Sequence, residues 1–108
     1  MARYRFQAAD TSEARATQAR HAQNRVEVIR PVFACLGGRL ECVYSAFGEY
    51  DVVVPAEMPD NVSATAIALA TTASGAFKIC MTTLLMTIEE GLEAMRKASG
   101  TGYRSPGN

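Results

Sequence analysis

The stretch 36-LGGRLECVYSAFGEYDVVVP-55 indicates two strands joined by a tight turn. Residues 39–46 alternate with the period of a half-buried strand, and the alternation predicts one shared face for four side chains: Leu40, Cys42, Tyr44 and Ala46. Gly48 can adopt a positive φ in the turn that follows. The run 51–54 is β-branched and apolar on both faces, which favours a strand inside a sheet. The stretch therefore predicts an antiparallel hairpin at the centre of the fold.

The composition is that of one small globular domain. The chain has 108 residues, of which 48% are hydrophobic, and this is enough for a single core. Its 11 basic and 11 acidic residues cancel without a block of like charge, which argues against nucleic acid or an anionic membrane as a partner. No apolar stretch approaches the roughly 18 residues of a membrane span, and residues 1–7 lack the apolar segment of a signal peptide. We therefore expect a cytoplasmic protein.

The cysteine and histidine content argues against a metal site. Cys35, Cys42 and Cys80 are odd in number and form no Cys-x-x-Cys pair, and His21 is the single histidine. We expect inert, buried thiols and an exposed histidine. The sequence also lacks the glycine patterns of phosphate and dinucleotide sites and a Ser/His/Asp arrangement with a usable histidine. No cofactor and no metal is therefore expected.

The segments before the hairpin predict a strand followed by helix. Residues 3–9 alternate, which predicts a first strand with one apolar and one polar face. Residues 12–22 are polar and alanine-rich, and they favour a short exposed helix or a partly irregular segment. Asn24 is a candidate helix cap, and apolar residues then recur at helical spacing up to Leu36. Pro31 lies inside this helix, where we expect a kink or a break.

The segments after the hairpin predict a helix, a strand and a second helix. Asp60 would cap a helix of mainly small residues, and residues 76–86 alternate as a fourth strand. Thr87 opens a capping box and a terminal helix. We expect one ferredoxin-like domain over residues 1–98 and a flexible tail over residues 99–108.

This order, β-α-β-β-α-β with an added helix, predicts an α+β fold of the ferredoxin-like type. Such a fold has a four-stranded antiparallel sheet with the helices on one face, here with an extra C-terminal helix. We expect the other face of the sheet to be open and of mixed polarity, with eight side chains on it: Arg3, Arg5, Gln7, Glu41, Val43, Ser45, Lys78 and Thr82. A sheet face of this kind usually meets another sheet or lines a cavity.

The turn Gly48-Glu49-Tyr50-Asp51 is followed directly by three valines. In this signature the chain resembles the GYD domain, a small bacterial domain family named after Gly, Tyr and Asp. The agreement continues in the same order through nearly the whole chain, at Leu36-Gly37-Gly38, Pro59-Asp60, Thr82-Thr83-Leu84-Leu85 and Gly102-Tyr103-Arg104. The resemblance implies a ferredoxin-like domain similar to the dimeric α+β barrels, in which two open sheet faces come together across a two-fold axis. It implies no particular reaction.

Asp51 is the main candidate for a functional residue. It begins a central strand directly after the turn, so we expect its carboxylate to be partly buried beside one of three arginines: Arg3, Arg5 or Arg39. Two roles remain open for it, as a general base or ligand contact and as a structural group that holds the turn. Tyr44 and Tyr50 are expected either to line a pocket or to pack in the core or an interface. The predicted ligand-binding candidates are therefore Asp51, Tyr50, Tyr44, Arg5 and Arg39.

Three functional hypotheses follow from these observations. The first is a small binding or structural module that assembles through its open sheet face into a homodimer or larger homo-oligomer, with a small organic ligand between sheet and helices or at the interface. The second is a cofactor-independent enzyme, such as an isomerase or monooxygenase, that acts on a small organic substrate near Asp51; it rests on analogy between folds. The third is binding of a regulatory partner through the tail around Tyr103.

Overall fold

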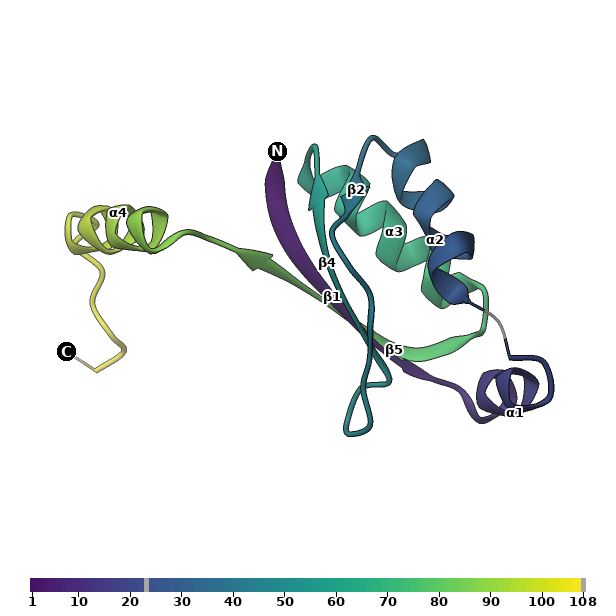
Figure 1. Cartoon of the computed structure of the whole chain (residues 1–108). Helices are drawn as coiled ribbons and strands as arrows, with labels where there is room; N and C mark the ends of the chain where they lie inside the picture. Colours follow the sequence, from purple (N-terminus) through teal and green to yellow (C-terminus); the bar gives the residue numbers. More distant parts are fainter. Residues whose placement is uncertain (23, 108) are drawn as a thin grey trace.

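The computed structural model describes residues 1–22 and 24–107, and its architecture is α+β (Figure 1). Asn108, the last residue of the expected tail, lies outside the described residues. The elements in chain order are β1 (Ala2–Asp10), α1 (Ser12–Arg20), α2 (Arg25–Cys35), β2 (Arg39–Leu40), β3 (Tyr44–Ser45), β4 (Val52–Met58), α3 (Asn61–Ala73), β5 (Phe77–Leu85) and α4 (Ile88–Ser99). The predicted ferredoxin-like order with an extra C-terminal helix is confirmed. Its second strand is divided into β2 and β3.

The strands form one antiparallel sheet in the order β2-β4-β1-β5, and β3 pairs with β4. The first strand, β1, lies in the middle and pairs with β4 on one side and β5 on the other. Helices α2 and α3 cover the same face of this sheet (Figure 1). We call the opposite side the open face, because no described helix covers it.

The second strand is interrupted where the sequence predicts a continuous one. Two pairs flank the interruption: Leu40 with Ala56, and Tyr44 with Val53. Three residues of one strand therefore lie opposite two of the other, which is the count of a β-bulge. One of those two is Pro55, whose carbonyl accepts a hydrogen bond of 3.0 Å from the N–H of Glu41. Because proline has no N–H, it cannot return that bond, and the ladder breaks beside it.

The bulge reverses the faces of the residues that follow it. Tyr44 pairs with Val53 and lies on the open face, 58% exposed. Val43 packs against the core instead. The prediction that Tyr44 shares the face of the buried Leu40 is therefore wrong, and so is the placement of Val43 and Ser45 on the open face. The strand β4, by contrast, continues beyond the predicted run and through Pro55 to Met58.

The residues of β5 that lie on the open face also differ from those predicted. Thr82 pairs with Phe6, a buried core residue, so Thr82 faces the helices. Met81 pairs with Gln7 and lies on the open face. Alternation alone divides β5 into two faces, but the register with β1 decides which of them is covered.

The hydrophobic core lies between the sheet and helices α2 and α3. Phe6 of β1 and Phe33 of α2 meet edge to face with their ring centroids 5.4 Å apart, a geometry that aromatic pairs favour. The hydroxyl of Tyr4 donates to Oδ1 of Asn61, which fixes the start of α3 over the sheet. Nine buried residues form the core: Tyr4, Phe6, Phe33, Leu40, Val54, Ala56, Met58, Ala64 and Ile67.

The main helices begin at the residues that the sequence predicts. The side chains of Asn24, Asp60 and Thr87 each accept a hydrogen bond from a backbone N–H in the first turn, and Thr87 forms a complete capping box. Helix α2 is not interrupted at Pro31. Both Pro31 and Glu27, whose carbonyl loses its helical donor, are exposed, so water can bond that carbonyl.

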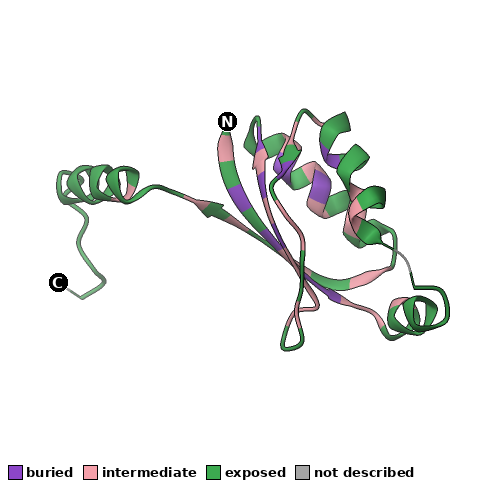
Figure 2. Cartoon of the chain, in the orientation of Figure 1, coloured by how far each residue is buried: buried purple, intermediate pink, exposed green. Residues whose placement is uncertain are grey.

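Helix α4 projects away from the rest of the fold (Figure 1). Its apolar side chains recur at helical spacing, yet Ile88, Leu92 and Met95 are 82%, 43% and 68% exposed. Figure 2 shows this helix as exposed along almost its whole length. The radius of gyration is 17.3 Å, compared with about 13 Å for a compact chain of 100 residues. The chain thus carries an amphipathic helix that the rest of the described chain does not bury.

Candidate functional site

Asp51 joins three elements at one end of the sheet. Its two carboxylate oxygens lie 2.9 and 2.8 Å from Nη2 of Arg15 in α1. Its Oδ2 also accepts a hydrogen bond of 2.7 Å from the backbone N–H of Asp10, at the end of β1. The hydrogen bond from Arg15, together with that from Asp10, lowers the pKa of Asp51 below its ordinary value. Asp51 is therefore an ionised group that fastens α1 and β1 to the start of β4.

The predicted arginine partners of Asp51 are wrong. Arg3 and Arg39 lie at the opposite end of the sheet, where Arg3 pairs with Glu41 at 2.8 Å and Arg39 pairs with Glu57 at 3.1 Å. The register explains this separation, because Arg3 and Arg39 both face Glu57 at the far end of β4 from Asp51. A helix that begins just after β1 supplies the cation instead.

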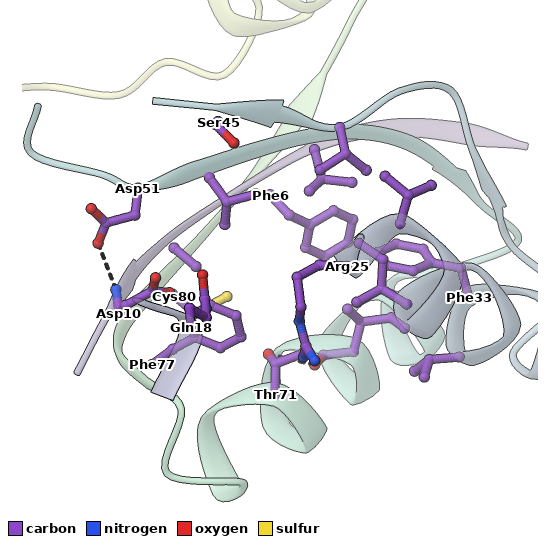
Figure 3. Close-up of a pocket in the computed structure, with 18 of the residues that line it drawn as sticks. Phe6, Asp10, Gln18, Arg25, Phe33, Ser45, Asp51, Thr71, Phe77 and Cys80 are labelled. Carbon is purple, nitrogen blue, oxygen red and sulfur yellow. Dashed lines mark hydrogen bonds between the residues drawn. The ribbon is translucent and has the colours of Figure 1, made fainter. Parts of the chain in front are cut away.

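A cavity of about 330 Å³ lies beside Asp51, between the sheet and helices α2 and α3 (Figure 3). Its walls are mainly apolar side chains from β1, β4, α2 and α3, among them Phe6, Ile29, Phe33, Val54 and Ile67. The volume lies within the range of about 300–1,000 Å³ that small-molecule sites occupy. The cavity adjoins the hydrophobic core and shares residues with it. The packing of α2 and α3 on the sheet therefore forms both the core and a space for a ligand.

Polar side chains from four elements and the segment before β4 stand around this apolar space. Asp10, Gln18, Arg25 and Thr71 come from β1, α1, α2 and α3, and Asp51 stands just before β4. In the view of Figure 3 the guanidinium of Arg25 projects from α2 toward Thr71. A mainly apolar pocket with a few polar groups at its edge is the usual design of a site for a small organic molecule.

Asp10 is the second acid at the cavity. Burial, followed by the charge of Asp51, raises the pKa of Asp10 above its ordinary value, and Arg15 and Arg25 act in the opposite direction. The two acids therefore differ, because Asp51 is held ionised by Arg15 whereas the ionised form of Asp10 is disfavoured.

The structure separates the five predicted ligand-binding candidates. Asp51 lines the cavity. Arg5 pairs with Pro55 and Thr83 on the open face, and the other three also belong to that face. Tyr44 and Arg39 lie in strand register there, and the hydroxyl of Tyr50 lies 3.7 Å from Sδ of Met81. A ligand role for the five residues stays a prediction, and one molecule in the cavity contacts Asp51 without the other four.

Several residues in or beside the cavity carry no recognisable signal in the sequence. Arg15 and Gln18 lie on a polar helix without an apolar stripe, and nothing local distinguishes them from other exposed residues. Arg25 carried one signal, its position directly after the predicted cap Asn24, which places it at the start of a helix that packs on the sheet. The thiols differ from prediction as well: Cys35 is exposed, and Cys80, which lines the cavity, is half-buried.

Comparison with known families identifies the class of protein. The model of the GYD domain family matches residues 4–95, which is most of the chain. The chain therefore belongs to the GYD domain family. No curated protein and no solved structure gave a match in the corresponding comparisons. The family assignment and the ferredoxin-like sheet agree with each other, and neither specifies a ligand or a reaction.

Two features are absent from the described part of the chain. No group of three or more His, Cys, Asp or Glu side chains within residues 1–22 and 24–107 is arranged to hold a metal ion. None of the helices in the same ranges is both long and apolar enough to cross a bilayer.

Proposed function

We propose that this GYD-domain protein is a small cytoplasmic binding module that holds an organic molecule between its sheet and helices and works as a homo-oligomer. The observation that carries the proposal is the cavity of about 330 Å³ with apolar walls and polar groups at its edge. Apolar surface removed from water is the main source of affinity in such sites. Phe6 of the sheet and Phe33 of α2, whose rings pack against each other, are part of that surface.

The contacts of Asp51 favour binding over catalysis. A general base needs an oxygen that can reach a substrate proton. Both oxygens of Asp51 already contact Arg15, and one also accepts the Asp10 N–H. The lowered pKa of Asp51, caused first by the hydrogen bond from Arg15, makes the carboxylate a weaker base. The enzyme hypothesis depends on Asp51, so these contacts argue against it.

Self-association is supported by two apolar surfaces of the same chain. On the open face, Tyr44, Ile79 and Met81 are 58%, 50% and 45% exposed. Helix α4 adds the exposed apolar stripe described above. A domain of this size buries only part of its apolar surface alone. A second copy is the occupant we propose for the open face, because a two-fold axis places the same patch of each copy against the other.

The binding proposal is tested with the full chain and a panel of single-ring and branched aliphatic compounds that includes acids, amides and alcohols. Saturation-transfer NMR reports which compounds bind. We expect at least one class to bind saturably and to compete with the others for one site. If none of the three classes binds at millimolar concentration, the cavity does not act as a ligand site and the proposal is wrong.

A further inference from the structure

We propose that the ligand is a monocarboxylate with an aromatic or branched aliphatic body, and that Arg25 binds its carboxylate. This inference rests on the proposed binding function and adds to it the chemical class of the ligand and the residue that selects it. It follows from the place of one cation, the charges around that cation and the shape of the walls beside it.

Arg25 differs from three other arginines of the chain. Arg3, Arg15 and Arg39 each pair with a carboxylate of the chain at 3.1 Å or less. The side chain of Arg25 lines the cavity, and it makes neither a hydrogen bond nor an ion pair with another residue in the described part of the chain. A guanidinium presents a planar fork of donors that fits a carboxylate with two parallel hydrogen bonds. The cavity therefore has an anion-binding group that the fold itself does not use.

The acids near Arg25 do not cancel its charge. Asp51 is paired with Arg15. The positive charge of Lys78 also lowers the pKa of Asp51, by less than the hydrogen bonds and the charge of Arg15 do. Asp10 is the remaining acid, and burial raises its pKa. Three cations, Arg15, Arg25 and Lys78, thus act on two acids, Asp10 and Asp51, which leaves one positive charge in excess even with both acids ionised. A ligand carboxylate would neutralise this excess positive charge.

The position of Arg25 also defines how the ligand lies. Arg25 is the first residue of α2, and Ile29 and Phe33 follow on the same side of that helix at spacings of four residues. A carboxylate held by Arg25 therefore has its apolar body directed along α2 toward the Phe6 and Phe33 rings. Ile67 of α3 and Val54 of β4 close the space around that body. A ring or a branched chain fills such a space better than a polar or a linear one.

The probe pair is phenylacetate and its neutral amide, phenylacetamide, which have nearly the same shape and differ in charge. Affinities are measured by NMR titration at low salt for three forms of the full chain: wild type, Arg25→Gln and Arg30→Gln. Arg30 is an exposed arginine of the same helix that does not line the cavity, so its variant controls for the loss of one positive charge. An Arg25→Lys variant tests the fork geometry, because lysine keeps the charge and loses the paired donors.

We expect wild type and Arg30→Gln to bind phenylacetate at least ten times more tightly than phenylacetamide, and Arg25→Gln to bind the two alike. Arg25→Lys should retain part of the preference. If wild type binds both compounds equally, or if Arg25→Gln keeps the preference for the acid, Arg25 does not select the ligand, although the cavity still binds one. If neither compound nor an alcohol of the same body binds any form, the proposed binding function itself fails.

Discussion

Nη2 of Arg15 lies within 2.9 Å of both carboxylate oxygens of Asp51, although 36 residues separate the two in sequence. The acid of the Gly-Glu-Tyr-Asp turn is thereby bound to helix α1, a helix with no buried residue of its own. Because α1 has so little apolar contact, this pair helps to fix the helix beside the cavity, together with the bonds of its cap Thr11 to the carbonyls of Gly75 and Ala76. We conclude that Asp51 shapes the cavity edge by holding α1 in place.

Replacing Asp51 with asparagine should loosen α1 selectively. The amide keeps the size of the side chain but loses the charge that binds Arg15. Hydrogen exchange is expected to accelerate in residues 12–20 and to stay unchanged in α3, because local openings have their own free energies. Glu49→Gln, an exposed acid in the same turn, is the control and should leave α1 unaffected. Equal exchange in α1 of wild type and Asp51→Asn would show that the pair does not hold the helix.

The same pair predicts how stability depends on pH. The pKa of Asp51 is lower in the folded chain, mainly because of the hydrogen bond from Arg15, than the value of about 3.9 for an unfolded aspartate. Its stabilisation is therefore complete above the unfolded value and is lost as the pH falls through the folded one.

The difference in unfolding free energy between wild type and Asp51→Asn should accordingly be largest near neutral pH and shrink in acid. Urea unfolding at a series of pH values from 7 to 2.5 measures it. Asp10 contributes to the pH dependence of stability with the opposite sign, because burial raises its pKa. The unfolding free energy of each protein should therefore change less with pH than the difference between the two proteins does. A difference that stays constant down to pH 2.5 would mean that Asp51 acts without its charge.

Filling the cavity should block binding without weakening the fold. Ala8 is buried and lines the cavity, so leucine at this position has room for its extra carbons. We expect Ala8→Leu to leave the unfolding free energy unchanged or to raise it by up to about 1 kcal/mol, and to abolish ligand binding. Ala64→Leu is the matched control, because Ala64 is equally small and buried but lies in packed core. It should lower the unfolding free energy by about 1–3 kcal/mol.

Denaturant unfolding of the two alanine variants distinguishes an open cavity from packed interior. If Ala8→Leu costs as much as Ala64→Leu, the space beside β1 is already filled in solution. If Ala8→Leu is stable and still binds, the ligand lies elsewhere.

A charge on the open face should dissociate the assembly. Met81, in the middle of β5, is 45% exposed on that face and lies opposite Gln7. We expect light scattering at micromolar concentration to give wild type at least twice the monomer mass, and Met81→Glu the mass of a monomer, because a buried unpaired carboxylate is costly. Val62→Glu on α3, at a position 80% exposed on the helix side, should keep the wild-type mass. A monomeric wild type would contradict the assembly proposal.

The sequence predicted those parts of the fold that local chemistry decides. Thr87 with Glu90 and Asp60 with Ser63 complete their hydrogen bonds within one helical turn, so the helix starts were correct. The strand order also followed from the order of the elements. The predicted strand covered residues 51–54, whereas β4 continues through Pro55, which lies opposite the bulge in the neighbouring strand.

Features that depend on contacts between distant segments could not be predicted in this way. The covered face of β5 is set by the register of Phe6 with Thr82, and the two residues are 76 positions apart. The partner of Asp51 is Arg15 rather than an arginine of the strands, because α1 folds back to the end of the sheet, which the sequence does not show. The cavity likewise arises from how α2 and α3 sit over β1, which no single segment encodes.

The most direct test of the account is a map of where a small molecule binds to the full chain. Amide shifts of the isotope-labelled protein are followed by NMR during titration with phenylacetate and with its neutral amide and alcohol counterparts. The account predicts saturable shifts that centre on Phe6, Phe33, Val54 and Ile67 and that disappear in Ala8→Leu. An absence of shifts with all three compounds, or shifts confined to the open face around Tyr44 and Met81, would contradict it.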